Sequence, residues 1–202
     1  MNSDTQQKII DGARDCFSKH GFRASNMSLI SRYAGFSRVT LHKHFKNKDR
    51  VFRAVCSDYQ SKYEADCRLI VAQQTPCWQM IEQITALWSS SAFNQVENDK
   101  VLRELLFETT QVADDILEAA RNSLKQMLQG ILDDAVCASQ ISLHACQLNS
   151  QQLAAIIVAS VNGIRSHFPR EQTLSASQQL LELYRLATLS QAQPARTIGQ
   201  SH

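Results

Sequence analysis

Residues 26–45, which read NMSLISRYAGFSRVTLHKHF, decide the fold. Two short amphipathic segments flank the turn Ala34-Gly35-Phe36-Ser37. Asn26 and Ser37 can each cap the helix that follows, because their side chains accept hydrogen bonds from free backbone amides. Two short helices joined by a tight turn that contains glycine are typical of a helix-turn-helix. The stretch therefore predicts this motif.

The segment after the turn has an anchoring side and an outer side. Leu41 and Phe45 are four residues apart, so they share one side of a helix. An α-helix fits a major groove about 12 Å wide, and Arg to a guanine edge is the commonest specific contact there. We expect Arg38 to contact a base, and Thr40 and Lys43 each to contact a base or a phosphate. The full outer set is Arg38, Val39, Thr40, His42 and Lys43.

Basic residues are concentrated in the first quarter of the chain. Residues 1–50 hold ten Lys/Arg and four Asp/Glu, a net of +6, whereas residues 51–202 hold eleven and fifteen, a net of −4. A basic segment on an acidic body is typical of a nucleic-acid-binding module. A solvated charged face explains the excess equally well from charge alone.

The rest of the chain is predicted to be helical, so the fold class is all-α. Only three Pro and six Gly interrupt 202 residues, and apolar side chains recur with helical spacing almost throughout. No segment alternates with the period of a strand. Helices are expected at about 5–20, 27–34, 38–46, 47–70, from Thr75-Pro76 onward, and at 100–110, 114–138, 149–168 and 175–190.

Residues 30–49 resemble the tetracycline-repressor (TetR) family, whose pattern there is roughly I-A-x-x-A-G-V-S-x-x-T-L-Y-x-H-F-x-x-K-E. The segment from Ala13 to Phe22, with Cys16, Phe17 and Gly21, is similar to the family's first helix and its exit. The resemblance covers about residues 9–55. Beyond it, the chain matches the family only in length and helical character.

The resemblance adds phosphate contacts to the expected interface. His42 stands where Tyr is usual and His44 matches the family's histidine, and both positions imply phosphate contacts. Lys48 opens a helix whose N-terminus can share a phosphate with its charge. Ser28 is a weaker phosphate candidate at the start of the second helix. Three further departures are Asn26, Ser31 and Phe36, which replace Thr, Ala and a smaller apolar residue.

In the family, a helical domain that binds an effector and forms a dimer follows the helix-turn-helix. We therefore expect a DNA-binding domain at 1–50, an effector-binding and dimerisation domain at 51–190, and a disordered tail at 191–202. Ala155, Ala159 and Gly163 form a stripe of small residues beside a larger apolar stripe, which favours close approach of a second subunit. The alternative is that both final helices lie inside one core.

The effector site is not evident in the sequence. Tyr63, Trp88, Phe107 and Met127 are weak candidates for lining it, but aromatic residues at helical spacing are more often plain core. Glu104 and Glu108 lie one turn apart, and we expect them to form a solvated helix face.

No metal site, cofactor or enzymatic activity is expected. His144, Cys137 and Cys146 are too scattered for a structural zinc site. No nucleophile motif or phosphate-binding glycine loop is present. No apolar run approaches the length of about 18 residues needed to span a membrane. We expect a cytoplasmic protein whose six cysteines are reduced and structurally passive.

Together these features predict a repressor that binds a palindromic double-stranded operator as a homodimer and is released by an unidentified small-molecule effector. Repression is what the resemblance implies. The alternative is an architectural or cell-organisation protein that uses the same DNA-binding domain without a small effector.

Overall fold

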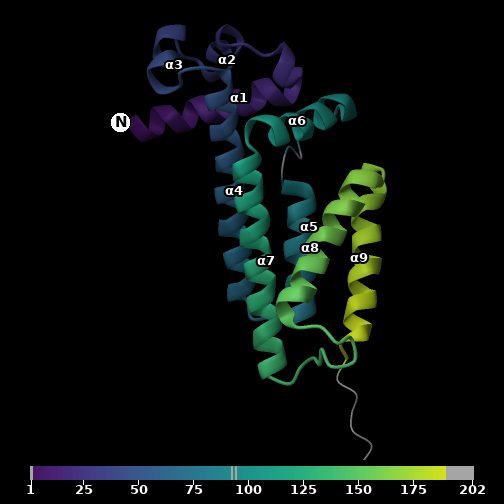
Figure 1. Cartoon of the computed structure of the whole chain (residues 1–202). Coiled ribbons are helices and arrows are strands. Elements are labelled where there is room, and N and C mark those ends of the chain that lie inside the picture. The colour runs from purple at the N-terminus through teal and green to yellow at the C-terminus, as the bar shows by residue number, and fades with distance from the viewer. Residues whose placement is uncertain (1, 92, 94, 190–202) are drawn as a thin grey trace, which may run out of the picture. The chain divides into compact units, whose positions relative to one another are not determined.

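The computed structural model describes residues 2–91, 93 and 95–189, most of which lie in helices (Figure 1). Within these residues no strand forms, and Ile141 and Leu189 make an isolated bridge. The all-α prediction is confirmed. The helices are α1 (Asn2–Ala24), α2 (Met27–Ala34), α3 (Arg38–His44), α4 (Lys48–Ala72), α5 (Cys77–Ser91), α6 (Asp99–Val112), α7 (Asp114–Cys137), α8 (Ser150–His167) and α9 (Arg170–Ala187).

Two helix ends are informative. Gly21 has φ 79° and ψ 172°, so regular helical geometry is interrupted inside α1 at the predicted stop. The sequence predicts that the last helix begins at residue 175, but α9 begins at Arg170. Pro169 occupies the N-cap, and its carbonyl accepts hydrogen bonds from the amides of Gln172 and Thr173, so the helix starts directly after it. The predicted tail at 191–202 lies outside the described residues.

The chain divides into two compact units, the first of which takes residues 1–74 and 83–124. Within it, α2 packs on α1, α3 on α2, and α4 and α6 both contact α1. Phe52 is fully buried, with its ring centroid 5.2 Å from that of Phe17 and 4.9 Å from that of Phe22. The expected boundary at residue 50 falls in the first turn of α4, and a functional division there remains a prediction.

The backbones of α1 and α2 approach closely at Gly12. A Cβ atom added at Gly12 would lie 2.4 Å from Cα of Ala34, closer than any non-bonded carbon pair tolerates. Glycine at this position therefore allows α2 to lie directly against α1. This contact sets the position from which α2 and the following turn present α3.

The second unit takes residues 75–82 and 125–202, and within its described part α8 packs against α9. Asn149 and Gln152 form a reciprocal capping box that starts α8. At the end of α9, the indole Nε1 of Trp78 donates to Oγ1 of Thr188 at 3.2 Å, and the amide of Ser142 donates to its carbonyl at 2.9 Å. These contacts fix the last turn of α9.

Candidate nucleic-acid interface

Local capping explains why the chain turns sharply between α2 and α3. Asn26 accepts a hydrogen bond from the amide of Leu29 at 2.9 Å, and Ser37 accepts one from Thr40 at 3.0 Å. Gly35 ends α2 with φ 71°. The amides of Gly35 and Phe36 donate hydrogen bonds to the carbonyls of Arg32 and Ser31 in α2. The left-handed conformation suits glycine because it lacks a Cβ. The predicted helix-turn-helix geometry is present.

The short helix α3 has one buried and one exposed side. Leu41 and Phe45 are buried in the core of the first unit. Arg38, His42 and Lys43 are exposed. Val39 is the most exposed large apolar side chain described, at 68%. The outer set predicted from the sequence therefore lies on the solvent side, where contact with DNA remains a prediction.

Four cations on and directly after α3 are exposed. Among the described residues, the side chains of Arg38, Lys43, Lys46 and Arg50 make no ion pair. Cations that are already exposed and unpaired can approach phosphate without first breaking a protein contact. They lie on α3, in the connection after it and in the first turn of α4, so this face of the first unit is basic.

The other residues predicted to contact DNA differ in their exposure and in the hydrogen bonds that they make within the protein. Nζ of Lys48 donates to the carbonyl of Phe22 at 2.8 Å and lies 4.0 Å from the centre of its ring. Oγ1 of Thr40 lies 2.9 Å from Oγ of Ser37. Ser28 is exposed, and His44 is half-buried. Lys48 and Thr40 therefore have structural partners that the sequence does not reveal.

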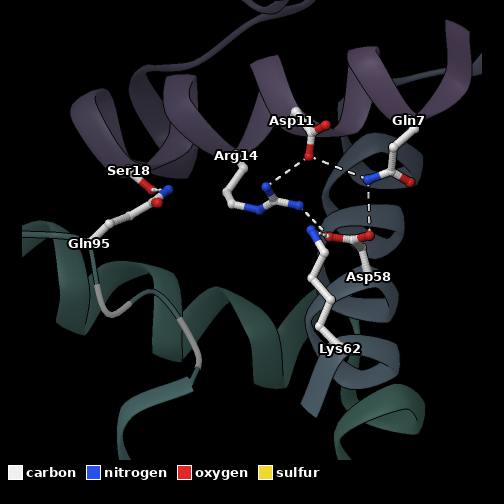
Figure 2. A network of polar contacts seen from close by, with 7 residues as sticks. All are labelled: Gln7, Asp11, Arg14, Ser18, Asp58, Lys62 and Gln95. Carbon is white, nitrogen blue, oxygen red and sulfur yellow. Dashed lines mark hydrogen bonds and ion pairs between the residues drawn. The ribbon is translucent and has the colours of Figure 1, made fainter. Parts of the chain in front are cut away.

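A polar network joins α1 to α4, as Figure 2 shows. Arg14 pairs with Asp11 at 2.8 Å and also with Asp58, while Lys62 lies 2.9 Å from the same carboxylate. Gln7 donates to Asp58 at 3.0 Å. Burial raises the pKa of Asp58, but the hydrogen bonds from Lys62 and Gln7 and the charges of Lys62 and Arg14 outweigh it. The pKa is lowered overall.

The acids of α6 correct an expectation. Glu108 is buried, with a side chain only 11% exposed, and it accepts a hydrogen bond from Nε of Arg23 at 2.9 Å. Glu104 accepts one from the backbone amide of Arg23 at 2.8 Å. The predicted solvated face is therefore wrong, because the end of α1 covers it.

The four weak effector candidates do not form one group. Tyr63 and Trp88 are buried together, with ring centroids 5.3 Å apart, and Tyr63 donates to the carbonyl of Ile84. Phe107 is 52% exposed on α6, with the guanidinium of Arg23 5.9 Å from its ring centre. Met127 is half-buried and belongs to the second unit. A role in effector binding stays a prediction for all four.

The cysteines are six free thiols. Burial raises the pKa of the Cys16, Cys67 and Cys77 thiols, and that of Cys56 to about 12. These four thiols are therefore protonated and poorly nucleophilic near neutral pH. Within the described residues, no group of three or more His, Cys, Asp or Glu is placed to hold a metal ion. Nor does any described helix combine the length and apolarity of a membrane span.

Known proteins match this arrangement. Residues 9–55 match the model for bacterial regulatory proteins of the tetR family. The HTH-type regulator YhgD of Bacillus subtilis is 20% identical over 94% of this chain and 99% of its own. The HTH-type repressor AcnR of Corynebacterium efficiens is 31% identical over 27% of this chain and 29% of its own.

A solved structure extends the likeness along the chain. SmeT, the repressor of the Stenotrophomonas maltophilia multidrug efflux pump SmeDEF, superposes with a TM-score of 0.69 at 18% identity. That match covers 98% of this chain and 96% of SmeT. Fold and motif together define a helix-turn-helix transcriptional regulator. Over residues 9–55 the chain is similar to the TetR family of bacterial regulatory proteins, and over nearly its whole length it shares the fold of SmeT.

Proposed function

We propose that the protein is a repressor whose α3 enters the major groove of an operator. The single observation that carries the proposal is the group of unpaired, exposed cations at Arg38, Lys43, Lys46 and Arg50. Cations that replace condensed counterions on phosphates supply affinity, while side chains at base edges supply specificity. Ser28, His42, His44 and Lys48 supply further phosphate contacts in this proposal.

A homodimer would place two copies of α3 on one duplex. Successive major grooves on one face are about 34–36 Å apart, so a two-fold dimer matches a palindromic operator. Exposed Ala159 of α8 and the exposed leucines of α9, Leu174, Leu183 and Leu186, support such an interface. Effector binding would favour a dimer whose spacing no longer fits the two half-sites.

The names of similar proteins support release by a small molecule. AcnR and SmeT are both called repressors, and SmeT has also been solved in a complex with triclosan. The SmeT–triclosan structure is 20% identical to this chain, with a TM-score of 0.66. By analogy, the helices from α4 onward hold the effector, and Tyr63 of α4 with Trp88 of α5 is the buried aromatic pair that we propose for this role.

The proposal is tested by selecting bound duplexes from fragmented genomic DNA and mapping the protected bases. A palindrome protected by the wild-type protein, bound at least about tenfold more tightly than a scrambled duplex, is the expected result. The protein–operator complex is then exposed to a library of small molecules that includes triclosan. Specific binding that no compound relieves would favour the architectural alternative, and binding without sequence preference would contradict the repressor.

A further inference from the structure

The segment Gly21–Ser25, at the end of α1, leads into α2 and is held by an internal hydrogen bond and by contacts with α4 and α6. Lys48 of α4 donates to the carbonyl of Phe22. Ser25 is buried and donates to the carbonyl of Gly21 at 2.6 Å. The contact with α6 is made through Glu104 and Glu108. Asn26, the N-cap of α2, follows immediately, so the position of this segment determines where α2 begins.

The contact with α6 is close and uses both the backbone and the side chain of Arg23. Its amide donates to Glu104 at 2.8 Å, and its Nε donates to Glu108 at 2.9 Å. A Cβ atom added at Gly21 would lie 2.8 Å from Oε1 of Glu104, so a larger residue there would displace this carboxylate. Gly21 and Arg23 of α1 thus lie directly against Glu104 and Glu108 of α6.

The C-terminal end of α6 is held by α4. Nη1 of Arg53 in α4 donates to the carbonyl of Val112 at 2.8 Å, and both Nη atoms donate to Asp115 at 2.6 Å. A paired Arg–carboxylate contact of this kind restricts orientation as well as distance. Because α4 holds one end of α6, the acids on α6 form a firm support for Arg23.

We propose that Arg23 is a positioning residue for operator binding, which acts by anchoring the start of α2 to Glu104 and Glu108 of α6. This inference rests on the proposed function. Arg23 is 68% exposed in its side chain and lies in the basic quarter of the chain, so charge alone would class it as a phosphate contact. Its guanidinium instead pairs with Glu108, while its backbone amide donates to Glu104, so both contacts assign Arg23 to the protein.

The positioning role and a phosphate-contact role for Arg23 predict opposite effects of removing Glu108 on operator binding. If Arg23 positions α2, removing Glu108 weakens operator binding as much as removing Arg23 does. If Arg23 contacts phosphate, removing Glu108 releases a cation and leaves binding unchanged or tighter. The salt dependence also differs, because each lost phosphate contact lowers the slope of log K against log salt by about 1.

The experiment measures operator binding over a salt series for Arg23→Ala, Glu108→Ala and the double variant, well below their melting temperatures. We expect each single change to weaken binding by roughly tenfold, as for a hydrogen bond to a charged group. The double variant should be no weaker than either single one, because the pair acts as a unit. All salt slopes should equal that of the wild type.

Lys19→Ala is the matched control, because Lys19 is an exposed cation one turn earlier on α1. It should leave binding within about twofold of wild type, as surface changes usually do. Reversal of both charges, Arg23→Glu with Glu108→Arg, should recover part of the affinity lost in Arg23→Glu alone. A lower salt slope for Arg23→Ala, or an unchanged affinity for Glu108→Ala, would overturn the proposal.

A readout without DNA separates this inference from the proposed function. Amide hydrogen exchange in residues 26–36 should become faster in Arg23→Ala and Glu108→Ala, while exchange in α9 stays unchanged. Unchanged exchange in residues 26–36 overturns the positioning role whether or not an operator exists. Faster exchange in a protein that binds no DNA supports the positioning of α2 and contradicts only the proposed function.

Discussion

Arg38 and Lys48 differ in what their side chains already contact. Arg38 begins α3 and is exposed without an ion pair among the described residues. Lys48 begins α4 and donates to the carbonyl of Phe22. One side chain can reach a base edge without losing a contact, whereas the other approaches phosphate from a fixed position. Specificity and general affinity should therefore separate between them.

Arg38→Ala should cost about 1–3 kcal/mol of binding on the true operator and much less on scrambled DNA. Lys48→Ala should weaken both duplexes alike and lower the salt slope by about 1. It should also lower the melting temperature through loss of the Phe22 contact, which Lys46→Ala, the control, should not do. Equal losses on both duplexes for Arg38→Ala would move the base contact to Thr40 and Lys43.

Asp58 makes the stability of the α1–α4 contact depend on pH. Its pKa is lowered in the folded protein from an ordinary value near 3.8. The stabilisation is therefore complete above that ordinary value and is lost as pH falls through the lower, folded-state pKa. Asp58→Asn should lower stability at pH 7 by about 1.5–3 kcal/mol, as for a lost charged hydrogen bond. Denaturant unfolding from pH 7 to pH 3 should show a smaller loss in the variant than in wild type.

At the scale of elements, two glycines should respond differently to alanine. Gly35 has φ 71° and open space around an added Cβ, so Gly35→Ala should cost only about 1–2 kcal/mol of backbone strain. At Gly12 the added Cβ meets backbone atoms of α2, and Gly12→Ala should cost about 3 kcal/mol or more. Denaturant unfolding measures both. Similar costs would mean that α2 moves away from α1 easily.

Local signals predicted these elements well. Asn26, Gly35 and Ser37 act on backbone groups within a few residues, so their roles are visible in the sequence and agree with the structure. The partners of Glu108 and Asp58 were not predictable. Arg23 is 85 residues from Glu108, and Arg14 is 44 from Asp58. Helical periodicity tells which residues share a face, but it does not tell which element covers that face.

For the whole molecule, the proposed dimer depends on α8 and α9. In the larger stripe of α8, Leu153, Ile157 and Val161 are buried, whereas Ala159 is exposed and a Cβ added at Gly163 meets nothing within 4 Å. On α9, Leu183 is 63% exposed. This separation favours a second subunit over the alternative of one shared core.

Ala159→Arg should convert a homodimer into monomers, because a long charged side chain would have to be buried at the close approach of two helices. Sedimentation velocity at micromolar concentration measures the change. Ala72→Arg, at the exposed end of α4, is the control and should stay dimeric. Wild-type protein that sediments as a monomer would contradict the dimer, and with it the two-half-site operator.

Each compact unit contains one of the two tryptophans. Trp88 is buried against Tyr63 in the first unit, while Trp78 is half-buried in the second and donates from its indole to Thr188. The protein thus has a separate intrinsic fluorophore in each half. In Trp78→Phe the emission follows only the unit that presents α3, and in Trp88→Phe it follows only the unit of α8 and α9. The two emission curves then tell whether the two units unfold together or one after the other.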